Sequence, residues 1–270
     1  MGQEGCRVRV GLAQITSTPE PAANLPLVAE QVRRAAEDGA ELVIFPEATM
    51  ACFGVPLRPL AQPLDGPWAS AVAQIADRHR VVVVAGMFTP AADGRVHNTV
   101  LVTGGGQHLG YDKIHLFDAF GFTESRTVAP GDKPVIVRVG GLSVGVATCY
   151  DVRFPELFRR LADEGAVAVA LPASWGSGPG KREQWELLVR ARALDCTSWV
   201  LASGQADPAA SGVAARPGAP TGIGHSLVAD PYGRVAAALD AAPGLLVTDI
   251  DEGVVAKARQ EIPVLANRRL

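Results

Sequence analysis

Long hydrophobic runs are missing from this 270-residue sequence, and so is any surplus of basic charge. No stretch approaches the ~18 consecutive apolar residues of a membrane-spanning helix, so no such segment is expected. The 25 Lys and Arg residues are outnumbered by 28 Asp and Glu residues, and a net charge of −3 disfavours nucleic-acid binding. Hydrophobic residues still make up 48% of the chain, which predicts a folded rather than a disordered protein.

Cysteine is also scarce, with four residues at positions 6, 52, 149 and 196 and no C-x-x-C pair. So few cysteines cannot form a disulfide scaffold in a chain of this length, which predicts free thiols. The N-terminal segment 1–10 lacks the apolar block and the small-residue cleavage site of a secretory signal. Together these absences predict a cytoplasmic protein with reduced cysteines.

Motifs for metals and nucleotides are absent as well. The five histidines show no H-E-x-x-H or other ligand spacing, so no metal site is predicted. The segment 178–181, Gly-Pro-Gly-Lys, resembles the end of a phosphate-binding loop, but Arg182 stands where that motif needs Ser or Thr. We therefore expect neither a metal nor an organic cofactor.

The sequence does contain an alternation of short strands and amphipathic helices. The runs 142–148 and 167–171 are almost entirely apolar, which is typical of strands buried on both faces. Further strands are predicted at 8–14, 42–45, 81–86, 97–102, 109–112, 135–139, 199–202, 224–229, 235–239 and 245–250. Helices are predicted at 25–36, 68–79, 154–164 and 181–196. The interleaving predicts a layered α/β protein, and because no linker-like stretch interrupts it, one domain over residues 1–270 is expected.

Three reactive side chains stand directly after predicted strands. Glu47 follows the strand 42–45, Lys113 follows 109–112, and Cys149 ends an apolar run. Ligands of open α/β folds collect beyond the carboxyl ends of strands, so a carboxylate, an ammonium and a thiol from separate strands can converge there. Taken singly, each residue is more simply explained as a surface charge or a buried thiol. The sequence around all three favours the functional interpretation.

These surroundings resemble the nitrilase, or carbon–nitrogen hydrolase, superfamily. The matching blocks, in the family's order, are Phe45-Pro46-Glu47, Tyr111-Asp112-Lys113-Ile114-His115-Leu116-Phe117 and Thr148-Cys149-Tyr150-Asp151-Val152-Arg153-Phe154-Pro155-Glu156-Leu157. The resemblance covers residues 7–265 and implies an α/β fold, a four-layer α-β-β-α sandwich. It also implies a homodimer or higher homo-oligomer without a cofactor. The apolar stripe of the helix 181–196 and the arm after Ile262-Pro263 are the expected contact surfaces.

Amide hydrolysis needs a nucleophile, a proton carrier and a stabiliser of the oxyanion, and the three strand-end residues supply all of them. Cys149 is the expected nucleophile. Glu47 is the expected general base, which takes the thiol proton and then protonates the departing ammonia. Lys113 stabilises the oxyanion, aided by the backbone N–H of Tyr150. Water then hydrolyses the thioester, again with Glu47 as base.

Other residues near these blocks receive supporting roles. The resemblance implies that Glu124 positions Lys113 or the substrate amide, although a loop carboxylate is the alternative. Trp175 follows another predicted strand and either lines the pocket or fills the core. Arg153 and Glu156 are expected to form an ion pair that holds the turn of the nucleophile.

The long helix raises the question of substrate. Arg190 and Arg192 are expected on a solvated helix face, although a role in binding a dicarboxylic substrate stays open. The segment 180–185, Gly-Lys-Arg-Glu-Gln-Trp, departs from the Pro-Ala-His that precedes the tryptophan in similar sequences. We expect it to border the substrate pocket.

The residues within these blocks are most similar to those of the Nit branch, which includes ω-amidase and deaminated-glutathione amidase. We expect an amidase that releases ammonia from a small acidic amide, with that amide and water as its substrates and with neither a nucleic acid nor a membrane as a partner. The alternatives are an N-carbamoyl amino acid, an aliphatic amide or a nitrile as substrate, and an inactive binding module. An activated Cys149 should alkylate before the other cysteines, with a pH profile below that of a free thiol.

Overall fold

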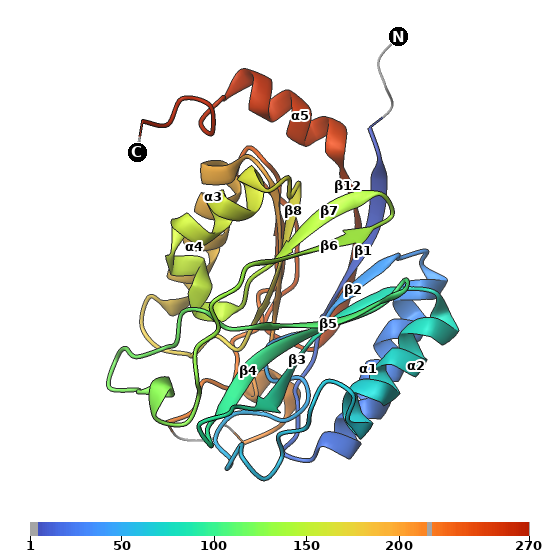
Figure 1. Ribbon diagram of the computed structural model, residues 1–270, viewed down its shortest axis with the longest axis vertical. Coiled ribbons are helices and arrows are strands. Elements are labelled where there is room, and N and C mark those ends of the chain that lie inside the picture. Colours follow the sequence, from blue (N-terminus) through green and yellow to red (C-terminus); the bar gives the residue numbers. More distant parts are fainter. Residues whose placement is uncertain (1–4, 215–217, 270) are drawn as a thin grey trace.

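The computed structural model describes residues 5–214 and 218–269, and its strands form two sheets of six strands each (Figure 1). The first sheet has the order β12-β1-β2-β3-β4-β5, with bounds Gly244–Asp251, Arg7–Gln14, Leu42–Ile44, Val82–Pro90, Val96–Gly104 and Gln107–Asp112. The second has the order β11-β10-β9-β8-β7-β6, with bounds Val235–Ala238, Leu227–Ala229, Trp199–Gly204, Ala168–Ala173, Leu142–Val146 and Val135–Val139. In each sheet three consecutive strands, β1-β2-β3 and β7-β8-β9, run parallel and the outer strands pair antiparallel.

Helices cover the outer face of each sheet. Helices α1 (Pro21–Glu37) and α2 (Pro67–His79) pack on the first sheet, and α3 (Pro155–Asp163) and α4 (Lys181–Cys196) pack on the second (Figure 1). The resulting order of layers, helix-sheet-sheet-helix, confirms the predicted four-layer sandwich. It also confirms the four predicted helices.

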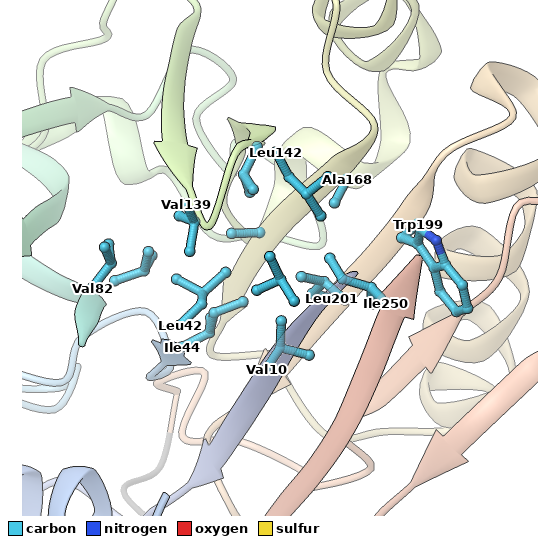
Figure 2. Close-up of a cluster of buried hydrophobic side chains, with 14 of the residues drawn as sticks. Val10, Leu42, Ile44, Val82, Val139, Leu142, Ala168, Trp199, Leu201 and Ile250 are labelled. Atoms are coloured by element: carbon cyan, nitrogen blue, oxygen red, sulfur yellow. The ribbon is translucent and has the colours of Figure 1, made fainter. Parts of the chain in front are cut away.

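Side chains between the two sheets form the central core. Val10, Leu42 and Ile44 point from the first sheet toward Val139, Leu201 and others of the second (Figure 2). The alternate residues of the same strands, such as Val43, pack instead against α1 and α2. Because both faces of these strands are buried, their sequences are almost continuously apolar rather than alternating.

One helix was not predicted, and one expected contact surface is wrong. Helix α5 (Glu252–Glu261) follows β12, and the Asp251 side chain caps it by accepting a hydrogen bond from the Gly253 N–H at 2.7 Å. The apolar stripe of α4, with Trp185 and Val189, packs on the second sheet and is buried within the chain. It is therefore unavailable as a surface between subunits. No helix in residues 5–214 and 218–269 combines the length and apolar content needed to cross a membrane.

Candidate active site

Glu47 lies in the turn after β2, where the chain crosses Gly86 of β3. A Cβ atom on Gly86 would collide with the backbone nitrogen of Ala48 and would lie 2.7 Å from the Glu47 Cα, so only glycine leaves room for this turn. Ala48 itself has a φ of 59°, in the left-handed region that non-glycine residues rarely adopt. The close packing and the unusual backbone together fix the position of the Glu47 backbone, from which the carboxylate side chain extends.

The Glu47 carboxylate is buried, and both of its oxygens are held. Oε1 accepts hydrogen bonds from Lys113 Nζ at 2.9 Å and from Asn98 Nδ2 at 2.7 Å. Oε2 accepts one from the backbone N–H of Ser174 at 2.9 Å. Ser174 follows β8 of the second sheet, so this carboxylate bridges the two sheets at the ends of their parallel strands.

Lys113 lies directly after β5 and is 2% exposed. Its Nζ donates to Glu47 and, at 2.9 and 3.2 Å, to both oxygens of Glu124. Burial alone would lower the pKa of Lys113, but the negative charges of Glu124 and Glu47 outweigh burial and raise it well above its ordinary value. The buried ammonium therefore keeps its charge between two carboxylates.

Glu124 begins the short 3₁₀ turn Glu124–Arg126 and is also buried. Its Oε2 accepts the backbone N–H of Phe117 at 2.6 Å, and its Oε1 accepts Asn98 Nδ2 at 3.0 Å. Burial raises the pKa of Glu124, but the Lys113 charge and these hydrogen bonds reverse the effect and lower it below its ordinary value. Glu124 is thus a charged anchor for Lys113 rather than a carboxyl that exchanges protons near neutral pH.

Cys149 begins the 3₁₀ turn Cys149–Arg153, after β7 of the second sheet. Its φ of 45° is a left-handed conformation for a non-glycine residue, a strain of the kind that clusters at functional sites. Asp151 stabilises the turn, since its carboxylate accepts the backbone N–H groups of Thr148 at 2.9 Å and of His115 at 3.0 Å. Because His115 belongs to the Lys113 segment, this carboxylate ties the thiol-bearing turn to that segment.

The thiol of Cys149 is buried beside the Glu47 carboxylate. Burial raises the pKa of Cys149 well above its ordinary value, the negative charge of Glu47 raises it further, and the Lys113 charge only partly opposes them. The expected pH profile below that of a free thiol is therefore wrong for the resting protein. Cys149 is a neutral thiol with a carboxylate placed to take its proton.

All six site residues predicted from the sequence line one cavity of about 30 Å³, room for roughly two water molecules. They are Glu47, Lys113, Glu124, Cys149, Tyr150 and Trp175. The remaining wall is largely aromatic, with Phe53, Phe117 and Phe122. The cavity therefore combines a thiol, two carboxylates and an ammonium with an apolar wall that excludes water.

Sequence reasoning missed two contributors to this site. Asn98 in β4 donates to both glutamates, and Ser174 supplies a backbone N–H to Glu47. Asn98 carries no clear signal, because it stands between the polar residues His97 and Thr99 in its strand. The amide of Ser174 carries none either, because any residue except proline supplies one. Lys181, in the segment 180–185 that was expected to border the substrate pocket, does line the cavity.

Two expectations about arginines are wrong. Arg153 donates to Gln184 Oε1 at 2.7 Å and lies 5.3 Å above the Trp175 ring, and no ion pair joins it to Glu156 in the described part of the chain. Arg192 is 8% exposed and pairs with Asp195 at 3.2 Å, so it does not belong to a solvated face. Burial lowers its pKa below the ordinary value. Both guanidiniums hold the surroundings of α4 in place.

No group of three or more His, Cys, Asp or Glu side chains in the described ranges is arranged to hold a metal ion. The two carboxylates that line the cavity, Glu47 and Glu124, already accept hydrogen bonds from Lys113.

Comparisons with known proteins relate this chain to carbon–nitrogen hydrolases. The family model described as carbon-nitrogen hydrolase matches residues 9–260. The chain is 57% identical over 267 residues to "Hydrolase Rv0480c" of Mycobacterium tuberculosis, covering 97% of this chain and 95% of that protein. It is 33% identical over 268 residues to "Deaminated glutathione amidase" of Escherichia coli O157:H7, covering 97% of each. Among solved structures, Saccharomyces cerevisiae Nit3, a member of branch 10 of the nitrilase superfamily, superposes with a TM-score of 0.85 at 25% identity, covering 99% of this chain and 98% of that one.

Proposed function

The chain belongs to the carbon–nitrogen hydrolase family of the nitrilase superfamily, and from this we propose that it is a thiol-dependent amidase acting on a small acidic amide. Cys149 is the proposed nucleophile, Glu47 the general acid and base, and Lys113 the stabiliser of the oxyanion. The observation that carries the proposal is that all three side chains line one buried cavity, with the Lys113 ammonium 2.9 Å from the Glu47 carboxylate.

The first step is acylation. The Cys149 sulfur attacks the amide carbon while Glu47 takes the thiol proton. The tetrahedral intermediate that precedes the thioester therefore forms without a free thiolate. Negative charge develops on the carbonyl oxygen, beside the Lys113 ammonium and the backbone N–H of Tyr150. Tyr150 lies in the first turn of its 3₁₀ segment, where backbone donors have no acceptor within the segment.

The second step releases the products. Protonated Glu47 donates its proton to the leaving nitrogen, the carbon–nitrogen bond breaks, and ammonia or an amine departs. A water molecule then attacks the thioester while Glu47 again takes a proton, and the carboxylic acid leaves as the thiol is restored. Glu124 remains charged throughout and keeps Lys113 in place.

Support for an acidic amide comes from two sources. The E. coli relative is named for deaminated glutathione, a compound that carries carboxylates as well as an amide. The narrow aromatic cavity fits a small acyl group and excludes bulk water from the thioester. An ω-amide of a 2-oxo acid has the same combination of features.

A substrate panel tests the proposal. The purified protein is assayed for ammonia, amine and carbon dioxide release from 2-oxoglutaramate, deaminated glutathione, N-carbamoyl amino acids, aliphatic amides and nitriles. We expect the acidic amides to be hydrolysed fastest, and Cys149→Ala to lower turnover by at least roughly a thousandfold with the fold unchanged by circular dichroism. Joint release of ammonia and carbon dioxide would favour carbamoyl hydrolysis. Turnover retained in Cys149→Ala would overturn the assignment of the nucleophile.

We also propose a homodimer, through a surface other than the buried stripe of α4. Leu187 and Leu194 lie two helical turns apart on the outside of α4 and are 64% and 40% exposed. Light scattering should report twice the chain mass for the wild type and a shift to one chain mass for the double substitution Leu187→Asp and Leu194→Asp. A monomeric wild type would contradict this proposal without affecting the catalytic one.

A further inference from the structure

Lys181 is the first residue of α4, and its side chain occupies the mouth of the cavity. It lines both the cavity that contains Cys149 and a neighbouring outer hollow formed with Phe120 and Pro220. The Nζ lies 4.1 Å from the centre of the Phe120 ring and 5.3 Å from that of Trp175. Lys181 therefore lies where the outer hollow and the cavity of the thiol adjoin.

This ammonium has no acidic partner in the described part of the chain, where none of the ion pairs involves Lys181. Lys181 is half-buried, whereas the fully buried Lys113 is held between two carboxylates. Burial and then the nearby positive charge of Arg153 lower the pKa of Lys181, and a charge on Cys149 opposes them. Aromatic rings attract a cation, but they replace only part of its lost hydration.

The position of Lys181 does not serve the helix that carries it. A cation at the N-terminus of a helix opposes the helix dipole, so any neutral residue would suit α4 better. Gly180 precedes it in a left-handed conformation, with a φ of 69°, which turns the chain so that the lysine meets the aromatic wall. An uncompensated charge that weakens its own helix is expected where a ligand supplies the missing partner.

We propose that Lys181 binds a carboxylate of the substrate, so that the preferred substrate is an amide with an anionic group at the end remote from the scissile carbon. This inference rests on the proposed function and makes it more specific. Among the described residues that line the cavity, Lys113 is already hydrogen-bonded to the two carboxylates, which leaves Lys181 as the cation available to an incoming anion. The buried Trp175 ring shields part of the ammonium from water, which strengthens the contact.

Glutaramate and glutaramide provide a matched test, since they have the same length and differ only in the charge of the remote end. We expect the wild type to prefer glutaramate, and Lys181→Met to lower kcat/KM for glutaramate by roughly 10- to 100-fold, mainly through KM. Hydrolysis of glutaramide should change less than about threefold. Lys181→Arg should keep much of the preference, and Lys257→Met, the same change on exposed α5, should have no effect.

A second readout separates this inference from the proposed function. Glutarate should protect Cys149 from iodoacetamide in the wild type, and the protecting concentration should rise at least tenfold in Lys181→Met. If the wild type hydrolyses neither amide, the proposed function fails while the protection assay still tests the carboxylate site. An equal loss for both amides, or unchanged protection in Lys181→Met, would overturn the role of Lys181.

Discussion

The Tyr111 hydroxyl donates a hydrogen bond of 2.7 Å to the buried carboxylate of Asp151. Tyr111 lies in β5 of the first sheet, two residues before Lys113, and Asp151 lies two residues after Cys149 in a turn of the second sheet. The same carboxylate accepts hydrogen bonds from the backbone and side chain of His115. The amine and the thiol of the site are therefore positioned by one shared carboxylate that touches neither of them.

Removing the Tyr111 hydroxyl tests this link. Tyr111→Phe leaves a buried carboxylate oxygen without one of its donors, and we expect a loss of about 1–3 kcal/mol in the free energy of unfolding, together with a lower kcat. Urea denaturation and steady-state kinetics measure the two effects. Tyr232→Phe is the matched control, because that hydroxyl donates to Glu261 at the surface and its removal should change stability little. A kcat equal to that of the wild type in Tyr111→Phe would show that the link is structural only.

Glu47→Gln should have opposite effects on hydrolysis and on alkylation. Without a general base, amide hydrolysis should fall by roughly 10²- to 10⁴-fold. The Glu47 charge raises the pKa of Cys149, so its removal should lower that pKa and move the midpoint of iodoacetamide alkylation to lower pH. Mass spectrometry of Cys149 adducts between pH 6 and about 11 follows the midpoint. A midpoint that stays fixed or rises would mean that Glu47 does not face the thiol as a carboxylate.

Asn98→Leu removes the amide that donates to both Glu47 and Glu124. We expect kcat to fall by roughly tenfold or more, because neither carboxylate is then fixed as tightly around Lys113. The hydrogen bond from Asn98 helps to lower the pKa of Glu124, so its loss should raise that pKa. The acid limb of the kcat profile should move to higher pH as Glu124 becomes easier to protonate. An unchanged acid limb with a reduced kcat would mean that Asn98 supports catalysis through Glu47 alone.

Gly86→Ala should displace the Glu47 turn. The added Cβ has no room against the backbone of residues 47 and 48. We therefore expect the free energy of unfolding to fall by about 1–3 kcal/mol and amide turnover to be lost to a greater proportion than stability. Gly244→Ala in β12 is the control, since a Cβ there would lie 3.4 Å from Leu239, an ordinary contact. Thermal unfolding and amide turnover compare the two variants. Similar effects in both would mean that the packing over Gly86 is not specific to the turn.

The layered fold and the meeting of Glu47, Lys113 and Cys149 could be predicted, because strand patterns and residue blocks are local in sequence. Contacts made across the two sheets were harder to predict. Asn98 looks like any strand residue until β4 is placed beside Glu124, and Arg192 looks solvated until α4 is packed on its sheet. The protonation state of Cys149 predicted from the sequence was also wrong. Burial and the adjacent Glu47 charge raise the pKa of the thiol, and neither can be read from the residue type alone.

Each sheet supplies an incomplete set of reactive groups. Glu47, Lys113 and Glu124 follow strands of the first sheet, whereas Cys149 and the Ser174 amide follow strands of the second. A polypeptide cut between β5 and β6 would leave the base and the amine on one fragment and the sulfur on the other. Neither fragment could turn over an amide alone. Mixing the two fragments would restore catalysis only if the contact between the two sheets formed again.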